Sequence, residues 1–214
     1  MAQNVHGLYR KAVSKHFKSL YANWTPGAER MLGDYGTFEG GIFVRLGNIR
    51  DKGIDFQVRV DQSPENHLFC EGGNYDLKLS GGATAEPVGS AKASITLHNK
   101  HSVFFQALDA RTNEIEDKEQ VGKQLIAGYQ DGTFSWERAW VVITEIVTAG
   151  RTVVAVSIES GATFELEAQA DVPVSQIMTN AEIGVSLTNT HSVGYHVDGA
   201  ALQLLIGVAK IKGW

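Results

Sequence analysis

The chain has 214 residues, of which 43% are hydrophobic and 20% charged, as in ordinary globular proteins, and we expect one domain over residues 1–214. Its formal net charge of −5 argues against general nucleic-acid binding, and its single cysteine excludes an intramolecular disulfide. Residues 1–4 begin no apolar signal segment, and the longest apolar stretch, 200–209, is shorter than the ~20 residues of a transmembrane helix, so we expect a cytoplasmic protein that becomes membrane-associated only by docking or refolding.

An N-terminal basic amphipathic helix is predicted within residues 1–22. Apolar residues recur at helical spacing from Val5 to Tyr21, Asn4 is a suitable N-cap, and Thr-Pro-Gly at 25–27 ends the pattern. One interpretation places this helix on an anionic bilayer, with its cations at the head groups and its apolar face in the interface. The other packs it on the protein with a solvated basic rim. The residues expected to bind the membrane are Arg10, Lys11, Lys15, Lys18, Leu8 and Leu20.

A strand-rich body is predicted at residues 33–214. Glycines interleaved with aromatics over 33–47 predict short strands joined by tight turns, and the small residues of 81–90 predict a loop. Residues 116–129 predict a second, shorter helix. Further strands are expected at 54–60, 139–147, 183–187, 193–197 and 202–211, with a turn at 62–66. The fold class is therefore α+β, a twisted antiparallel β-sheet with an N-terminal amphipathic helix and a few short helices.

Two segments, 91–107 and 154–172, alternate apolar and polar residues most regularly, as strands with one apolar face do. Each can close as a hairpin that keeps this face apolar. A five-residue turn at 98–102 would pair Leu97 with Val103, and a three-residue turn at 159–161 would pair Ile158 with Ala162. The same registers continue as Ile95 with Phe105, Ala93 with Ala107, Val156 with Phe164, and Val154 with Leu166.

Three interpretations of these segments are open. Most alternating strands belong to an ordinary antiparallel sheet with one buried face, and the second segment could also be a single strand bent at Gly161. The third interpretation is a pair of membrane-inserting hairpins, because the arms of the second have roughly the ~9–11 residues that a membrane-spanning strand requires. The inserting residues would be Ile95, Leu97, Val103, Phe105, Val154, Val156, Ile158, Phe164 and Leu166.

No catalytic constellation is expected. Cys70 lies near His67 and Glu71 in the sequence, but a thiolate nucleophile needs a base that a third group orients, and a buried or incidental thiol is the simpler interpretation. The seven histidines show no metal-binding spacing, and the chain has no phosphate-binding loop motif. We therefore predict a non-enzymatic protein with no metal and no cofactor.

Three stretches resemble the pore-forming N-terminal domain of gasdermins. They are the basic helix at 8–20, the strand WVVITEIVT at 140–148 leading into 153–172, and the strand pair 183–187 and 194–197. The resemblance implies a twisted antiparallel sheet whose regions 89–108 and 151–172 extend into membrane-spanning hairpins of an oligomeric ring. It also implies a role in cell death or defence, with an anionic lipid membrane and further copies of the chain as partners. The pore-lining residues, which would favour cations, are Glu159, Glu165, Glu167 and Asp171.

The sequence also departs from that family. Gasdermins are usually inhibited by a C-terminal segment, for which the sequence leaves no room after Trp214, so we expect a regulatory protein partner. Residues 24–27 and 33–36 have no counterpart in the family. The alternative function is a soluble, non-enzymatic binding or assembly module that uses the 33–47 region or its exposed strands.

Overall fold

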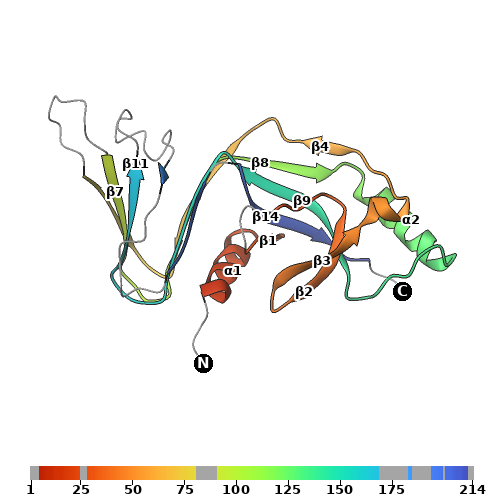
Figure 1. Cartoon of the computed structure of the whole chain (residues 1–214), viewed down its shortest axis with the longest axis horizontal. Helices are drawn as coiled ribbons and strands as arrows, with labels where there is room; N and C mark the ends of the chain where they lie inside the picture. Colours follow the sequence, from red (N-terminus) through yellow and green to blue (C-terminus); the bar gives the residue numbers. More distant parts are fainter. Residues whose placement is uncertain are drawn as a thin grey trace. The chain divides into compact units, whose positions relative to one another are not determined.

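The computed structural model describes residues 5–24, 28–80, 91–168, 183–184, 194–199 and 201–211 (Figure 1). The fold is α+β, with mostly antiparallel strands and, over these residues, two α-helices, of which one is N-terminal. The chain divides into two compact units. Unit 1 contains residues 1–12, 65–110 and 149–202, and unit 2 contains residues 13–64, 111–148 and 203–214.

Helix α1 (Val5–His16) confirms the predicted N-terminal helix, but it ends at His16 rather than at Tyr21. Leu20 and Tyr21 belong instead to strand β1 (Leu20–Ala22), which pairs with β14 (Leu202–Ala209). Sheet pairing overrides the helical spacing here because it satisfies the backbone groups of this segment. Along α1, the buried residues Leu8, Tyr9, Ala12 and Val13 contrast with the exposed residues Arg10, Lys11 and Lys15, and Lys18 beyond its end is also exposed.

Unit 2 is built on a sheet in which β1, β14, β9 (Val141–Ala149) and the end of β8 (Val103–Ile115) follow one another. Strand β4 (Val58–Val60) pairs with the end of β8, and β2 (Asp34–Glu39) pairs with β9. Seven of the nine residues of β9 and the four central residues of β14 are buried, which confirms the central strand predicted at 139–147 and the buried strand predicted at 202–211.

The strand expected at 54–60 is wrong over its first half. Only Val58–Val60 is a strand, and it follows a 3-10 helix, η1 (Ile49–Lys52), which Gly53 ends with a left-handed φ of 78°. Ile54 is a loop residue with 4% of its surface exposed. Its burial in the core, rather than strand alternation, accounts for its apolar side chain.

Helix α2 (Lys118–Gln130) confirms the helix predicted at 116–129. The Asp117 side chain caps it by accepting a hydrogen bond from the backbone N–H of Gln120 (2.8 Å). Val121 and Leu125, one turn apart, are both buried in the core of unit 2. This core consists of Ile49, Ile54, Ile115, Val121, Leu125, Trp136 and Val142.

The glycine-rich region 33–47 forms a hairpin of β2 and β3 (Ile42–Asn48), as predicted. Its two-residue turn, Gly40–Gly41, has positive φ at both positions (58° and 88°), a conformation that suits glycine. Among the described strands, β3 pairs only with β2. Ile42 and Leu46 are exposed on this edge strand, by 37% and 49%.

Unit 1 contains two four-stranded antiparallel sheets. In one of them, β7 and β11 lie side by side (Figure 1). The first sheet has the order β5-β8-β10-β13, with residues 103–110 of β8, and the second has the order β6-β7-β11-β12. The bounds are β5 Glu65–Glu71, β6 Tyr75–Ser80, β7 Ala91–Leu97, β10 Arg151–Ser157, β11 Ala162–Ala168, β12 Ile183–Gly184 and β13 Gly194–Gly199.

The two hairpin registers predicted for these segments are wrong. Strand β7 pairs with β6 and β11 instead of β8, and β10 pairs with β8 and β13 instead of β11. Leu97 therefore lies opposite Ala162 and Tyr75, and not opposite Val103. The alternative of one strand bent at Gly161 describes the second segment, since β10 and β11 flank a bend. The positions 81–90, 169–172, 185–187 and 193 lie outside the described residues.

Candidate functional site

The chain of unit 1 passes from one sheet to the other at three described bends, residues 72–74, 98–102 and 158–161 (Figure 1). Each bend contains left-handed backbone, at Gly72 (φ 92°), His101 (φ 63°) and Gly161 (φ 72°). The Asn99 side-chain amide donates to the Gly72 carbonyl (3.0 Å), and Ser157 N–H donates to the Ser102 carbonyl (2.9 Å). The bends are thus neighbours, and together they form what we call the bend line.

The strands keep one register across the bend line. Val103 pairs with Val156 in the β8–β10 ladder, and Ala91 pairs with Ala168 in the β7–β11 ladder. In both ladders the residue numbers of every pair add to 259. Segments 91–108 and 151–168 therefore form a single antiparallel ladder that is folded in its middle without a slip.

The next pair of strands shows the same continuity. Thr152 pairs with Gly199 on one side of the bend line and Glu167 pairs with Gly184 on the other, and both pairs add to 351. Among the described strands, only β5 and β6, the outer segment, do not keep the same sum on both sides of the bend line. The sum is 174 in β5–β8 (Phe69 with Phe105) and 172 in β6–β7 (Leu77 with Ile95). The folded sheet has four segments, each with a strand on either side of the bend line. Three of them, which contain β7 and β8, β10 and β11, and β12 and β13, could straighten without any strand exchanging its partner.

Aromatic side chains are buried on both faces of β8. On one face, the Phe105 ring stacks on Phe69 (centroids 4.9 Å apart) and on Tyr9 of α1 (6.5 Å). On the other face, Phe104 makes an edge contact with Tyr75 of the second sheet (4.9 Å). Because successive strand residues point to opposite faces, this part of β8 lies between α1 and the second sheet.

An apolar stripe also crosses the bend line. Odd-numbered residues of 91–108 pair with even-numbered residues of 151–168. Because paired residues lie on the same face of a sheet, these two sets share one face within each ladder. If alternation continued without the bend, the apolar members of both sets would lie on one face of a straight ladder. Nine of the apolar members are at most 2% exposed: Ile95, Leu97, Val103, Phe105, Ala107, Val154, Val156, Ala162 and Phe164.

The other face of the second sheet is polar where it is described. The hydroxyls of Thr96 and Thr163, which lie opposite each other, share a hydrogen bond (3.0 Å). Glu159 is exposed in its bend, whereas Asp171 lies outside the described residues. Glu165 and Glu167 are on β11, and the backbone register places Glu167 opposite Lys92.

A scan against protein-family models and a search of curated proteins found no match to this chain. Over the described residues, no helix combines the length and the apolar character that crossing a membrane requires. The geometry of unit 1 and the exposed cations of α1 therefore carry the functional inference.

Cys70 and His67 are not arranged as a nucleophile and its base. Both lie on β5 three positions apart, so their side chains point to opposite faces. Burial, and then the charge of Glu71, raise the pKa of the Cys70 thiol, which keeps it protonated and unreactive. Within the described part of the chain, no three His, Cys, Asp or Glu side chains are grouped closely enough to hold a metal ion.

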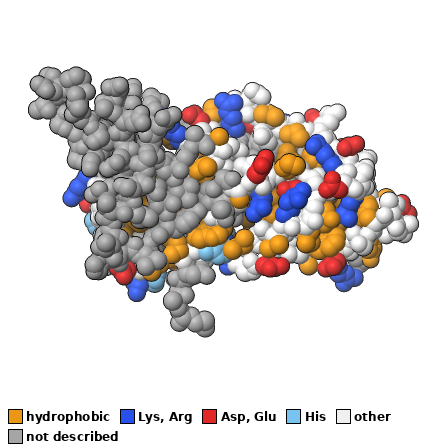
Figure 2. All heavy atoms as spheres, in the orientation of Figure 1, with side chains coloured by type: hydrophobic (Ala, Val, Ile, Leu, Met, Phe, Trp, Pro, Cys, Tyr) orange, Lys and Arg blue, Asp and Glu red, His pale blue; other side chains and the backbone are white. Residues whose placement is uncertain are grey.

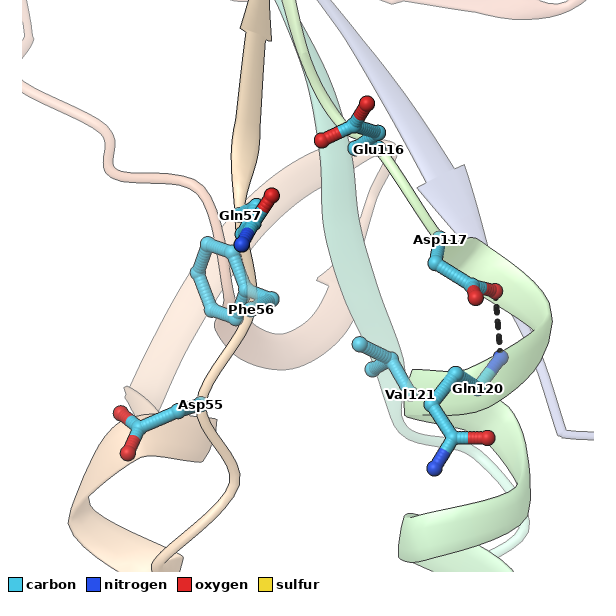
Figure 3. A pocket seen from close by; sticks show the side chains of 7 residues that line it. All are labelled: Asp55, Phe56, Gln57, Glu116, Asp117, Gln120 and Val121. Carbon is cyan, nitrogen blue, oxygen red and sulfur yellow. Dashed lines mark hydrogen bonds between the residues drawn. The ribbon is translucent and has the colours of Figure 1, made fainter.

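Unit 2 has an open, acidic pocket of about 650 Å³ beside the N-terminus of α2 (Figure 3). Asp117 is already engaged there as the helix cap, and Glu116 N–H donates to the Gln57 carbonyl (3.0 Å). None of the membrane-binding or inserting residues predicted from the sequence lines this pocket. Its walls are Asp55, Phe56 and Gln57 on one side and Glu116, Asp117, Gln120 and Val121 on the other.

Sequence reasoning missed β5 and β6, which form the outer segment of the folded sheet. The alternation of Tyr75, Leu77 and Leu79 was the available signal for β6. The start of β5 at Glu65 also falls inside the turn expected at 62–66. With these strands included, the sequential hairpins of unit 1 span 65–108 and 151–199.

Proposed function

We propose that this protein permeabilises membranes by forming oligomeric pores, in the manner that the gasdermin resemblance implies. The folded sheet of unit 1 would straighten along the bend line into two long amphipathic hairpins, 65–108 and 151–199. The observation that supports this most directly is the register shared across the bend line, because the ladder pairs can persist while the sheet changes shape.

The lengths fit a bilayer. Each of the segments 91–108 and 151–168 has 18 residues, whereas a membrane-spanning strand needs about 9–11. At about 3.3 Å per residue, such a strand would be roughly 60 Å long, which leaves residues at both ends to extend beyond the hydrocarbon core.

The surroundings of the protein, water or lipid, determine whether the folded or the straight sheet is more stable. The stripe includes seven large apolar side chains, and leaving each in water costs about 1.5–3 kcal/mol, so a straight sheet that has also lost the cover of α1 is disfavoured in water by roughly 10–20 kcal/mol. A bilayer would cover the same stripe with lipid and offset this cost. The proposal therefore requires the folded form in solution and the straight form only on a membrane.

Docking would begin at α1. Arg10, Lys11, Lys15 and Lys18 are exposed, whereas Leu8 is 8% exposed and already packed in the protein. The cations can therefore meet anionic head groups without unfolding, and the apolar face would follow only if α1 left its site. Each such cation adds about 1 kcal/mol near an anionic surface, enough for reversible docking.

Dye release from vesicles tests the proposal. We expect release from vesicles that contain an anionic lipid, little release from phosphatidylcholine vesicles, and ring-like oligomers after detergent extraction. Intact anionic vesicles, with the wild-type chain and with the Gly161→Ala variant described below, would rule the proposal out.

A second candidate function is a soluble binding module. The observation that favours it is the exposed edge of β3, where Ile42 and Leu46 face solvent. Hydrogen exchange separates the two functions, because a static module protects the amides of β7, β8, β10 and β11 with and without vesicles. The pore proposal expects exchange on both sides of the bend line to change when anionic vesicles are added.

A further inference from the structure

A second pocket of unit 2, with a volume of about 310 Å³, is basic and apolar. Arg30 and Arg50 line it, together with apolar side chains that include Phe56, Val58 and Ile146. None of its described lining residues is acidic. On the face shown in Figure 2, basic and acidic side chains are interspersed over the described part of the molecule.

Neither guanidinium group has a carboxylate partner among the described residues. The Arg30 guanidinium carbon lies 5.7 Å from the Phe43 ring centre, and among the described residues this group donates only a long hydrogen bond, to the Phe43 carbonyl (3.5 Å). Its Nε is buried without a hydrogen-bond partner, which is costly for a donor. Arg50 stacks on Phe56 (4.3 Å) and makes a similarly long bond to the Phe56 carbonyl (3.5 Å).

The backbones of both arginines are held in place. The Gln203 side chain accepts from Arg30 N–H (2.7 Å) and donates to the Arg30 carbonyl (3.0 Å). Arg50 N–H donates to the Asn48 side chain (3.0 Å), which caps η1. Together with the contacts of the two guanidinium groups with Phe43 and Phe56, these bonds restrict both arginines before any ligand arrives, which lowers the entropic cost of binding.

We propose that this pocket binds an amphiphilic anion, with its phosphate or carboxylate group between Arg30 and Arg50 and its apolar part against Phe56 and Ile146. A guanidinium group binds such oxyanions through paired, charge-assisted hydrogen bonds. The ligand could be a soluble monoester or the head group of a lipid. This site is separate from the bend line, and it does not depend on pore formation.

Calorimetric titration with phenyl phosphate and with inorganic phosphate tests the site. We expect phenyl phosphate to bind more tightly, because only it fills the apolar part of the pocket. Arg30→Met and Arg50→Met should each weaken phenyl phosphate binding by at least about tenfold, the loss expected for a charge-assisted contact. Arg138→Met is the matched control, because it removes the same charge from an exposed residue outside the pocket and should leave binding unchanged.

Vesicle flotation identifies the source of the anion. Binding to phosphatidylcholine vesicles that contain phosphatidic acid, if weakened in Arg50→Met and unchanged in Arg138→Met, assigns the site to a lipid head group. Phenyl phosphate binding without this vesicle effect assigns it to a soluble anion. Arg50 is exposed, so its variant should keep the wild-type melting temperature even if Arg30→Met does not fold. Equal affinities of Arg50→Met and Arg138→Met for phenyl phosphate, or no binding by the wild type, would overturn the proposal.

Discussion

At the scale of single residues, the contacts of Asp34 explain the motif at residues 33–36, which has no counterpart in the family that the sequence resembles. Its carboxylate is 1% exposed and accepts hydrogen bonds from Met31 N–H (3.0 Å), Arg45 Nε (2.8 Å) and Asn48 Nδ2 (3.0 Å). It therefore ties the loop before β2 to the end of β3. These contacts require a charged acceptor at this position and account for the aspartate between Gly33 and Gly36.

Asp34→Ala should destabilise the protein by about 3 kcal/mol, because it leaves buried donors unsatisfied and Arg45 without its partner. The measurement is the free energy of unfolding in urea. Asp61→Ala, at a half-buried loop position that accepts only from Ser63 N–H, is the control and should change stability far less. Equal losses in the two variants would show that the Asp34 contacts contribute little.

Glu114 should govern part of the acid sensitivity of unit 2. The hydrogen bond from Lys118 (2.6 Å) lowers the pKa of this carboxyl below its ordinary value of 4.5, and Arg59 also contributes. A carboxyl group whose pKa is lowered in the folded state stabilises that state above about pH 4.5. This stabilisation is lost as the pH falls through the folded-state pKa of the group. Glu114→Gln should therefore flatten the decline in melting temperature below pH 4.5. Glu119→Gln removes an exposed pair with Lys123 and should keep the wild-type decline.

At the scale of elements, Gly161 connects the bend to the proposed function. Its φ of 72° suits glycine, whereas an extended strand would accept any residue, so Gly161→Ala should selectively destabilise the folded sheet by about 1 kcal/mol. We expect faster dye release from anionic vesicles. Gly132 is matched, with a φ of 76° and no atom within 4 Å of an added Cβ, and Gly132→Ala should lower stability without speeding release.

A substitution at His101, in the neighbouring bend, should have the opposite effect on backbone strain to Gly161→Ala. It adopts a φ of 63° despite its side chain, so His101→Gly should relieve strain and stabilise the folded form. Dye release should slow in this variant under conditions where Gly161→Ala accelerates it. Changes of the same sign in both variants would contradict the role of the bend line.

Local pattern predicted the elements better than their partners. Strand β7 and the start of α2 lie close to where alternation and helical spacing place them, because those signals depend on neighbouring residues. Alternation through 91–107 is identical for a hairpin and for a bent strand, so the pairing of Leu97 could not be decided locally. The apolar residues of the candidate site were predicted, whereas the bend line and the pocket of Arg30 and Arg50 depend on contacts between residues distant in sequence.

At the scale of the whole molecule, the exposed cations near the N-terminus contrast with a net charge of −5. We expect the double variant Lys11→Gln/Lys18→Gln to bind anionic vesicles about thirtyfold more weakly, at about 1 kcal/mol for each lysine. Vesicle sedimentation at low and high salt is the measurement, since salt should weaken wild-type binding. Lys123→Gln/Lys210→Gln removes equal charge elsewhere and should bind like the wild type.

The shared register also constrains how such a chain could vary in length. Deleting one residue from 98–102 alone would shift every pair of β7 by one position and turn its apolar residues to the polar face. A matching deletion in 158–161 would restore that ladder, and β6 and β12 would each need one more to keep their own pairing. Insertions and deletions at the bend line should therefore be tolerated only in compensating sets, so that a single-residue deletion in one bend is suppressed by matching deletions far away in the sequence.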